Sequence, residues 1–464
     1  MTVVERTERY ASSAMPTSPK LLIWAGLAVI VLLGAFLRLQ ATAHTIVELP
    51  IRADAAHYFW YAYNLHRHGT YSHQPPVSEG AETAPVPDSL RAPGYPLLIS
   101  LLMDDPPTQG TLVEVIWLQA ILGIALIGLV FLFARALMPP AWALLAAFLT
   151  AISPHLVNAG VYLLTETLYS LMLVLMLLSL ALAASRQRLR WFALAGAALG
   201  LATLVRPTTL YFPLLLIALC IWQWGLREGG RRGVLFLVGF VIVYGAWPAR
   251  NLVQFGHAGD PQLQINMLHH GMYPNFMFDQ RPESYGFPYR LDPRGGEIGA
   301  SVDAVRLEIA RRFQEETAEH VKWYLFGKPR ALWSWSIVQG MGDAFVYPVT
   351  QSPYFSSPIF AATHHASRLL HTPLVLIAAV FSFLVWIPAV MRSMSFRSVF
   401  LLRSVALILM YVTLLHMAGA PFPRYAVPFR PELYLAACGM LALLHSSVRQ
   451  RWRGPQICSG ERSP

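Results

Sequence analysis

The sequence predicts an all-α protein that crosses a membrane several times, and three observations support this class. Charged residues make up only 13% of the 464 positions, about half the share found in an average soluble domain. Hydrophobic residues make up 55%, and the mean hydropathy is +0.46. Apolar runs of roughly 18 or more residues, long enough to cross a bilayer as a helix, recur along the chain. This pattern excludes a soluble enzyme, a disordered chain, a disulfide scaffold and a porin-type barrel.

The apolar runs predict about ten transmembrane helices, and at most about 13. They fall approximately at residues 21–36, 112–137, 141–154, 162–184, 191–205, 209–224, 233–247, 373–390, 399–417 and 431–445. When the N-terminus is placed in the cytoplasm, every loop with clustered arginines also falls on the cytoplasmic side, including the loops near Arg135, Arg186 and Arg227. The positive-inside rule therefore predicts that both termini are cytoplasmic. It also accounts for the net charge of +10 without a nucleic-acid partner.

The predicted helices leave two long segments outside the membrane. In order, the chain divides into residues 1–20 (cytoplasmic N-terminus), 21–40 (first transmembrane helix), 41–111 (first outer segment, with juxtamembrane helices), 112–249 (transmembrane helices), 250–371 (second outer segment), 372–446 (C-terminal transmembrane helices) and 447–464 (basic cytoplasmic tail). Residues 41–43 resemble a signal-peptidase site, so a cleaved signal peptide is the alternative to a first membrane anchor.

The second outer segment contains an amphipathic helix pattern. Val302, Val305, Ile309 and Phe313 recur at helical spacing, with charged residues between them. Aromatic residues suited to the headgroup level follow from Trp323 onward. We expect a helix that lies on the outer face of the membrane.

The first outer segment holds the first candidate for chemistry, Asp54. A helix is expected to begin here with Asp54 as its N-cap, and capping alone would explain the residue. The functional alternative is a general base, because the aromatic run from Tyr58 to Tyr63 would form a partly dry wall and raise the pKa of the carboxyl. His57 and Tyr58 lie on the same expected helix and are candidates for substrate binding.

Two further patches combine an ionisable residue with the start of a helix. Arg91 and Tyr95 flank a Pro-Gly pair, which predicts a turn followed by a helix and needs no further role. Glu166 is expected in the first turn of a membrane helix, where the helix dipole favours an acidic side chain. A carboxylate at the membrane boundary is otherwise costly, which leaves a functional role for Glu166 open.

Arginines mark the last two patches. Arg206 and Arg424 lie at the outer ends of spans, where the positive-inside rule gives no reason for a basic residue, and Tyr425 follows Arg424 directly. Snorkelling to lipid headgroups is one explanation, and bidentate hydrogen bonding to a phosphate group is the other. The predicted topology places all five patches on one side of the membrane at one depth. Carboxylates and arginines that meet there indicate a lipid-phosphate substrate.

The order of these patches resembles the dolichyl-phosphate-mannose protein mannosyltransferase and aminoarabinose transferase superfamily, whose members are membrane glycosyltransferases with the GT-C fold. The resemblance rests on Arg52-Ala53-Asp54-Ala55 after the first span, Pro93-Gly94-Tyr95-Pro96, Thr165-Glu166-Thr167, Arg206-Pro207, Lys322-Trp323-Tyr324-Leu325 with Arg330 and Trp333, and Arg424-Tyr425 with Pro428. It extends over nearly the whole chain. Some members carry two adjacent acidic residues in the first outer loop, whereas here Asp54 is followed by Ala55.

The resemblance implies an enzyme that moves a sugar from a polyprenyl-phosphate carrier to an acceptor, with inversion at the anomeric carbon. Asp54 would take the proton of the acceptor, and Arg206 and Arg424 would stabilise the departing lipid phosphate. The acceptor is a lipid, a glycan or a protein, and its choice is expected to reside in residues 250–371. A divalent metal is left open as a cofactor. The expected location is a plasma membrane, such as the inner membrane of a bacterium, with the active site facing away from the cytoplasm.

A lipid or polysaccharide transporter or flippase is the main alternative, and a non-catalytic scaffold of the cell envelope is a third. Transporters commonly show repeat symmetry and ionisable groups at mid-membrane. The sequence shows no internal repeat and few ionisable residues within the spans. It also contains no P-loop, GxSxG, HExxH, CxxC or dinucleotide-binding motif. These observations favour an enzyme whose active site lies at the membrane surface.

Overall fold

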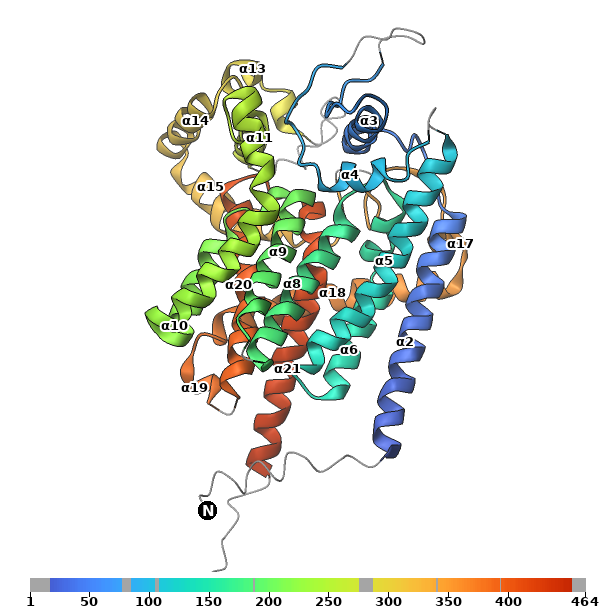
Figure 1. The fold of residues 1–464 in the computed structure, drawn as a ribbon, viewed down its shortest axis with the longest axis vertical. Helices are drawn as coiled ribbons and strands as arrows, with labels where there is room; N and C mark the ends of the chain where they lie inside the picture. Colours follow the sequence, from blue (N-terminus) through green and yellow to red (C-terminus); the bar gives the residue numbers. More distant parts are fainter. Residues whose placement is uncertain are drawn as a thin grey trace, which may run out of the picture.

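The computed structural model describes residues 17–76, 85–104, 108–186, 188–274, 287–338, 341–392 and 394–452. Within these residues the regular structure is helical except for one small antiparallel sheet, in which β1 (Ile46–Val47) pairs with β2 (Val349–Gln351). The predicted all-α class is therefore confirmed. Long helices form a bundle, and shorter helices lie over one end of it (Figure 1).

The bundle consists of α2 (Thr17–His44), α5 (Gln109–Arg135), α6 (Pro140–Ile152), α8 (Glu166–Arg186), α9 (Arg190–Val205), α10 (Phe212–Tyr244), α18 (Pro358–Leu384), α20 (Phe396–Ala418) and α21 (Arg430–Trp452). Over its upper end in Figure 1 lie α3 (Ala53–His68), α4 (Gly94–Ser100), α11 (Ala246–Phe255), α12 (Pro261–Gly271), α13 (Gly295–Ile298), α14 (Val302–Glu315) and α15 (Thr317–Lys322). Shorter elements connect them: α7 (Pro154–Asn158), η2 (Ala159–Val161), η3 (Pro207–Thr209), η5 (Pro288–Arg290), η6 (Trp323–Gly327), α16 (Lys328–Leu332), α17 (Pro353–Ser356), α19 (Pro388–Met391) and η7 (Pro423–Phe429).

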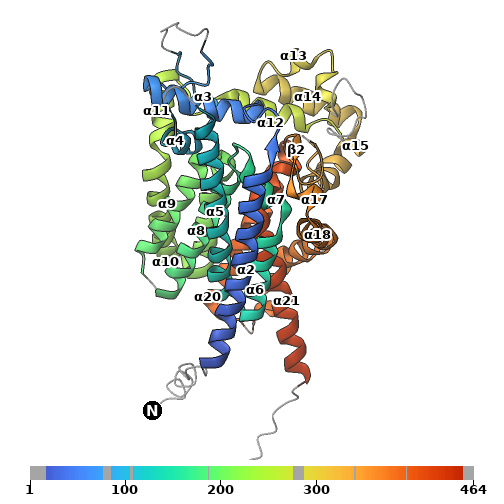
Figure 2. The same cartoon turned by 90° about the vertical axis from the view of Figure 1, so that its right-hand side faces the viewer.

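The two ends of the described chain lie at the same end of the bundle. Helix α2 begins and α21 ends at the bottom of Figure 1, and both run upward toward the layer that contains α3 and α14 (Figures 1 and 2). We call the upper end the site end and the lower end the terminal end. Arg135 and Arg186 close α5 and α8, which begin near the site end, so these arginines lie toward the terminal end.

Six helices in the described part of the chain are long and apolar enough to cross a membrane, and two bent helix pairs raise the number to eight. The six lie in α2, α5, α8, α18, α20 and the segment Pro423–Ser446. The bent pairs are α6 with the segment Pro154–Val161, which contains α7 and η2, and α10 with α11. These lengths and hydropathies define a multi-pass integral membrane protein. The sequence prediction of about ten spans is higher, in part because α9 has only 16 residues.

Helix α10 also differs from the predicted division, which placed two spans here. Gly225 inside α10 has φ 78° and ψ 169°, and these angles interrupt the helix. A Cβ on Gly229 would lie only 2.2 Å from the carbonyl oxygen of Cys220, so the second half folds back along the first. The two halves of α10 thus correspond to the two runs that the sequence separates.

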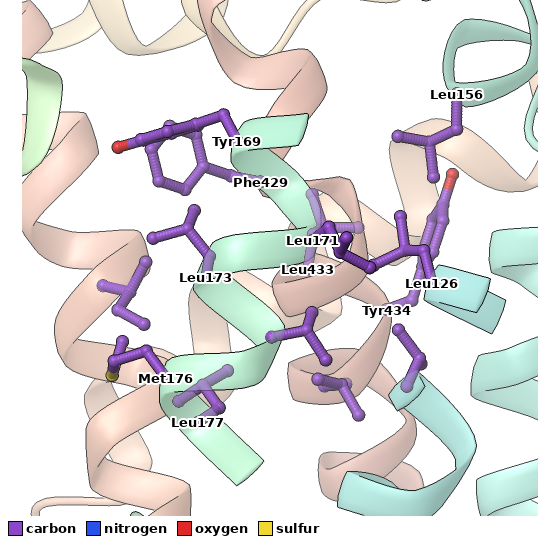
Figure 3. Packing of buried hydrophobic residues seen from close by; sticks show 14 of the residues in the cluster. Leu126, Leu156, Tyr169, Leu171, Leu173, Met176, Leu177, Phe429, Leu433 and Tyr434 are labelled. Carbon is purple, nitrogen blue, oxygen red and sulfur yellow. The ribbon is translucent and has the colours of Figure 1, made fainter. Parts of the chain in front are cut away.

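Helix α8 occupies the centre of the bundle. Its side chains Leu173, Met176 and Leu177 are fully buried, and Figure 3 shows them among the apolar side chains of the core. The same view places Leu171 of α8 beside Leu433 of α21. Because α8 is enclosed by its neighbours, its first residue, Glu166, has a fixed place at the site end of the core.

The layer over the site end has a small core of its own. Val305 of α14 is fully buried in a cluster with Ile265 of α12 and Trp323 of η6. The predicted amphipathic helix is therefore present, and Val305 on its apolar face packs on α12 and η6, which bury it completely. Its predicted position on the outer face of the membrane stays a prediction.

Candidate active site

The site begins at the N-terminus of α3, which carries Asp54. Helix α3 starts at Ala53, and Arg52 occupies the N-cap position without a capping side-chain hydrogen bond. Asp54 is thus inside the first turn, and the prediction that it caps the helix is wrong. Its carboxylate instead accepts one hydrogen bond from Arg91 (Nη2 to Oδ1, 2.6 Å) and one from Arg424 (Nη1 to Oδ2, 2.8 Å). Two arginines from distant segments therefore hold Asp54.

Arg91 reaches Asp54 because the turn that follows it is pressed against α9. Helix α4 begins at Gly94, as the Pro-Gly pair predicts. A Cβ on Gly94 would lie 2.8 Å from the carbonyl carbon of Leu204, so only glycine allows this approach. Arg206 follows Leu204 by two residues, so the same contact brings the Arg91 turn close to a second predicted arginine.

Arg424 is the central member of the site. Its Nε donates to Glu166 Oε1 at 2.7 Å while its Nη1 donates to Asp54. Arg206 Nη1 approaches the same Glu166 oxygen at 3.3 Å. The five residues form one row of alternating charge, which we call the charge chain: Arg91, Asp54, Arg424, Glu166 and Arg206.

The inner part of the charge chain is almost dry. The side chain of Glu166 is 1% exposed and that of Arg424 is 7% exposed, whereas that of Asp54 is 30% exposed. Glu166 Oε2 is buried and accepts no hydrogen bond from any residue that the structure describes. A buried oxygen without a donor is unfavourable, and such atoms are uncommon in folded proteins. The charge chain therefore has one unoccupied hydrogen-bond acceptor, Glu166 Oε2, next to Arg424 and Arg206.

The electrostatics of Asp54 differ from the prediction. Burial by itself would raise the pKa of this carboxyl, but Arg91 and Arg424 outweigh burial and hold the pKa well below its usual range. The expectation that an aromatic wall raises the pKa toward neutrality is wrong, because the sequence does not reveal that both oxygens are paired with arginines. Arg91 in turn has a raised pKa, because Asp54 outweighs the effect of burial.

The other predicted residues differ in how close they lie to the charge chain. His57 Nδ1 lies 3.3 Å from Arg91 Nη2, and burial with the nearby Arg91 lowers the pKa of this histidine. Arg91 also lies over the ring of Tyr58, and Arg206 lies 4.7 Å from the centroid of the Tyr425 ring. Tyr95 lies behind Tyr58, with its hydroxyl donating to Gln119 Oε1 at 2.9 Å.

The sequence analysis missed Tyr347, which precedes β2. Its hydroxyl is buried and has no hydrogen-bond partner among the described residues, although the backbone N–H of Ala55 lies near it. Burial raises the pKa of Tyr347 to about 12, and Arg424, Asp54 and Glu166 all act on it electrostatically. Tyr347 therefore lines the site. Its place depends on the pairing of β1 with β2, which short strands in a loop-rich sequence do not reveal.

The residues of the site do not fit a metal ion. The described part of the chain contains no group of three or more histidine, cysteine, aspartate or glutamate side chains arranged to hold one. The two carboxylates of the charge chain are separated by the guanidinium of Arg424, which already supplies a positive charge between them. We therefore derive no chemical step through a metal.

Comparisons with known proteins bear on the family and on the fold. Residues 91–248, which include Arg91, Glu166 and Arg206, match the model of the family described as dolichyl-phosphate-mannose-protein mannosyltransferase. No curated protein matches the sequence significantly.

Solved structures of membrane glycosyltransferases share the fold. The archaeal oligosaccharyltransferase AglB from Archaeoglobus fulgidus, in complex with an inhibitory peptide and a dolichol-phosphate, matches with a TM-score of 0.53 and 16% identity, over 97% of this chain and 53% of that chain. The oligosaccharyltransferase of the same organism, tethered with an acceptor peptide containing the NVT sequon, matches with a TM-score of 0.52 and 14% identity, over 93% of this chain and 50% of that chain. ArnT from Cupriavidus metallidurans, bound to undecaprenyl phosphate, gives a TM-score of 0.39 and 15% identity, over 95% of this chain and 80% of that chain.

The fold is thus that of the GT-C membrane glycosyltransferases. Within that class, the match over residues 91–248 confirms the resemblance to the dolichyl-phosphate-mannose-protein mannosyltransferase family that the order of motifs predicted. The chain spans about half the length of the oligosaccharyltransferases it matches.

Proposed function

We propose that the protein is a glycosyltransferase that moves a sugar from a polyprenyl phosphate to an acceptor at the site end of the bundle, with inversion at the anomeric carbon. The charge chain is the observation that carries this proposal. Its three guanidinium groups and two carboxylates leave a net charge of +1, and they join the first turn of α3 to the first residue of α8. A polyprenyl-phosphate sugar is a phosphodiester with one negative charge, so the donor neutralises the site.

The departing lipid phosphate is the group that the arginines stabilise. When the bond between the anomeric carbon and the phosphate oxygen breaks, the phosphate becomes a monoester and gains negative charge. Arg424 has bonds to two carboxylates, so it can exchange one of them for a phosphate oxygen while it keeps the other. Fixed guanidinium groups that face developing charge lower the barrier without further reorganisation.

Asp54 has two candidate roles in this reaction. It accepts hydrogen bonds from Arg91 and Arg424, so its first candidate role is to position these two arginines for the phosphate. The role predicted from the sequence is that of the general base, which requires that Arg424 first move from Asp54 to the phosphate and so release the carboxylate. Variants of Asp54 distinguish the two roles, because loss of an anchor and loss of a base have effects of different size.

We propose that the site end faces away from the cytoplasm. This orientation follows from the arginines at the terminal end, such as Arg135 and Arg186, and from the positive-inside rule. A donor that faces this side must be lipid-linked, because soluble nucleotide sugars are confined to the cytoplasm. The acceptor is a lipid, a glycan or a protein that is accessible from the same side.

The test uses purified protein in detergent with polyprenyl phosphates that carry mannose, glucose or aminoarabinose as probe donors. A membrane extract from cells without the protein supplies the acceptors. The proposal predicts that one probe loses its sugar and that free polyprenyl phosphate accumulates, whereas Arg424→Ala protein is inactive. If the donors remain intact but cross vesicle membranes that contain the protein, it is a transporter and the proposal fails.

A further inference from the structure

The charge chain ends at Arg91, which contacts His57 as well as Asp54. Asp54 and His57 are three residues apart on α3, so they share one face of that helix. Arg91 Nη2 donates to Asp54 Oδ1 at 2.6 Å and lies 3.3 Å from His57 Nδ1. Burial and the nearby Arg91 lower the pKa of His57 from its usual value of 6.5, so the ring is neutral at pH 7. An arginine only donates, so His57 accepts at Nδ1 and carries its proton on Nε2.

A second histidine, His73, lies against His57. The two rings meet edge to face, with their centroids 5.2 Å apart. His73 Nδ1 lies 2.7 Å from Asp88 Oδ2, and the backbone N–H of His73 donates to the same oxygen at 3.0 Å. An ionised carboxylate only accepts, so in neutral His73 the proton is on Nδ1 and the lone pair is on Nε2.

Asp88 fixes the place of His73 relative to the charge chain. Its second oxygen accepts from the backbone N–H of Leu90 at 3.2 Å and from the hydroxyl of Tyr61. The Tyr61 hydroxyl in turn accepts from the backbone N–H of Arg91 at 3.3 Å. One aspartate therefore orients the ring of His73 and, through Tyr61, the turn that carries Arg91.

The two histidines leave one donor and one acceptor without a partner. No residue in the described part of the chain bonds to Nε2 of His57 or to Nε2 of His73. The side chain of His73 is 35% exposed and that of Asp54 is 30% exposed, so solvent reaches both. A hydroxyl group can accept from His57 Nε2 and donate to His73 Nε2. Because both rings are neutral, they suit an uncharged polar group, whereas the arginines of the charge chain suit a phosphate.

We infer that His57 and His73 together bind a hydroxyl group of a substrate next to Asp54, an inference that rests on the proposed function. Both the acceptor and the sugar of the donor carry hydroxyl groups. The acceptor is the expected source, because His73 lies at the exposed side of the site, whereas Arg424, which would hold the phosphate, is 7% exposed. The acceptor is then held next to the carboxylate that would take its proton.

Two substitutions of His73 separate the bond to Asp88 from the bond to the substrate. Asparagine places its side-chain amide near the position of Nδ1, where it can still donate to Asp88, but it has no atom at the position of Nε2. Glutamine is long enough to place an amide oxygen, which is a hydrogen-bond acceptor, at the position of Nε2. His68→Ala, which removes an exposed histidine from the last turn of α3, is the matched control.

The test measures transfer from polyprenyl-phosphate-mannose, or from the sugar donor that the wild type uses, to acceptors in the membrane extract. For His73→Asn we expect that half-maximal rate needs about ten times more extract, as for the loss of one hydrogen bond, while the KM for the donor is unchanged. His73→Gln should need an amount of extract closer to that of the wild type, and His68→Ala should equal the wild type. A tenfold rise in the KM for the donor instead would assign the bound hydroxyl to the donor sugar.

Two results would overturn the inference. One is His73→Asn with the wild-type dependence on both extract and donor. The other is an equal loss in His73→Asn and His73→Gln, because His73 would then serve the structure of the loop and not the substrate. Both results require that the wild type transfers sugar. If the wild type itself transfers none from any polyprenyl phosphate, the proposed function fails, and the hydroxyl site fails with it.

Discussion

Two networks of arginines and carboxylates lie at the site end of the bundle, and they are built in different ways. The charge chain draws its five residues from five segments spread over most of the sequence, between Asp54 and Arg424. The second network, which we call the outer cluster, comes from one short stretch of the chain that includes α14: Asp292, Arg294, Glu308, Arg311 and Arg312. In the outer cluster, both oxygens of Glu308 accept hydrogen bonds from arginines.

The difference lies in burial and in completeness. Glu308 at the centre of the outer cluster is 3% exposed, but its partner Arg311 is 43% exposed, whereas Arg424 at the centre of the charge chain is 7% exposed. Exposed pairs at helical spacing form with the helix itself and contribute about 0–1 kcal/mol each. Burial of charges from distant segments costs several kcal/mol per ion before any attraction offsets it. The charge chain also leaves Glu166 Oε2 without a donor. A network that is unfavourable to bury and lacks one hydrogen bond is expected where a ligand supplies that bond. A local network in which all hydrogen bonds are formed is expected where the residues only stabilise the fold.

The largest effect should follow from Arg424→Ala, because Arg424 is the central link of the charge chain. Removal of one partner from a buried ion pair typically costs about 3–5 kcal/mol, and here two carboxylates would be left facing each other. We expect loss of sugar transfer and a clear fall in thermal stability. Arg424→Lys keeps the charge but cannot form bidentate hydrogen bonds. We therefore expect its thermal stability to be closer to that of the wild type than its use of the donor. Donor titration and thermal unfolding in detergent measure both. Equal donor use in wild type and both variants would mean that Arg424 does not contact the phosphate.

Asp54→Asn should have the next largest effect. Asparagine occupies the same volume but cannot pair ionically with Arg91 and Arg424, so the site becomes more positive. If Asp54 is the anchor, turnover should fall by about one order of magnitude, in line with the loss of about 1.5 kcal/mol from a charged hydrogen bond, and the KM for the donor should not rise. If Asp54 is the base, turnover should fall at least about a hundredfold. Turnover at saturating donor decides between the anchor and the base.

A smaller effect, which disappears in acid, should mark the outer cluster. A hydrogen bond from Arg311, against burial and together with Arg312, lowers the pKa of Glu308 from 4.5 to about 2. A carboxyl with a lowered pKa in the folded state stabilises the fold above its ordinary pKa, and this contribution is lost as the pH falls from about 4.5 toward 2. Thermal unfolding of wild type and Glu308→Gln should therefore differ by a constant amount above pH 5 and converge below it. A difference that does not change with pH would show that Glu308 is not held ionised by the arginines.

The smallest effect should come from Arg311→Ala. Arg311 is exposed and pairs with Glu308 and Glu315 on its own helix. We expect a thermal midpoint close to that of the wild type and unchanged sugar transfer. If sugar transfer in Arg311→Ala falls as far as in Arg424→Ala, the outer cluster and the charge chain do not differ in function.

Much of the fold could be predicted because apolar runs and arginine clusters are local features of a sequence. Helices α5, α8 and α20 lie where the hydropathy indicates, and the Pro-Gly turn before α4 begins its helix as expected. These features depend on neighbouring residues only.

The chemistry of the site could be predicted only in part, because it depends on contacts between distant segments. The five members of the charge chain were each singled out, yet nothing in the sequence shows that Arg424 bonds to both Asp54 and Glu166. For that reason the direction of the Asp54 pKa shift was predicted with the wrong sign.

Binding of polyprenyl phosphate to the purified protein, measured by titration in detergent, shows whether the charge chain holds the lipid phosphate. Wild-type protein, Arg424→Ala and the matched control Arg311→Ala are compared at the same ionic strength. We predict one saturable site in the wild type, the same affinity in Arg311→Ala, and at least tenfold weaker binding in Arg424→Ala, as expected for the loss of one charged hydrogen bond to phosphate. Equal affinity in Arg424→Ala and Arg311→Ala would contradict the account, because the charge chain would then not be the site that holds the lipid phosphate.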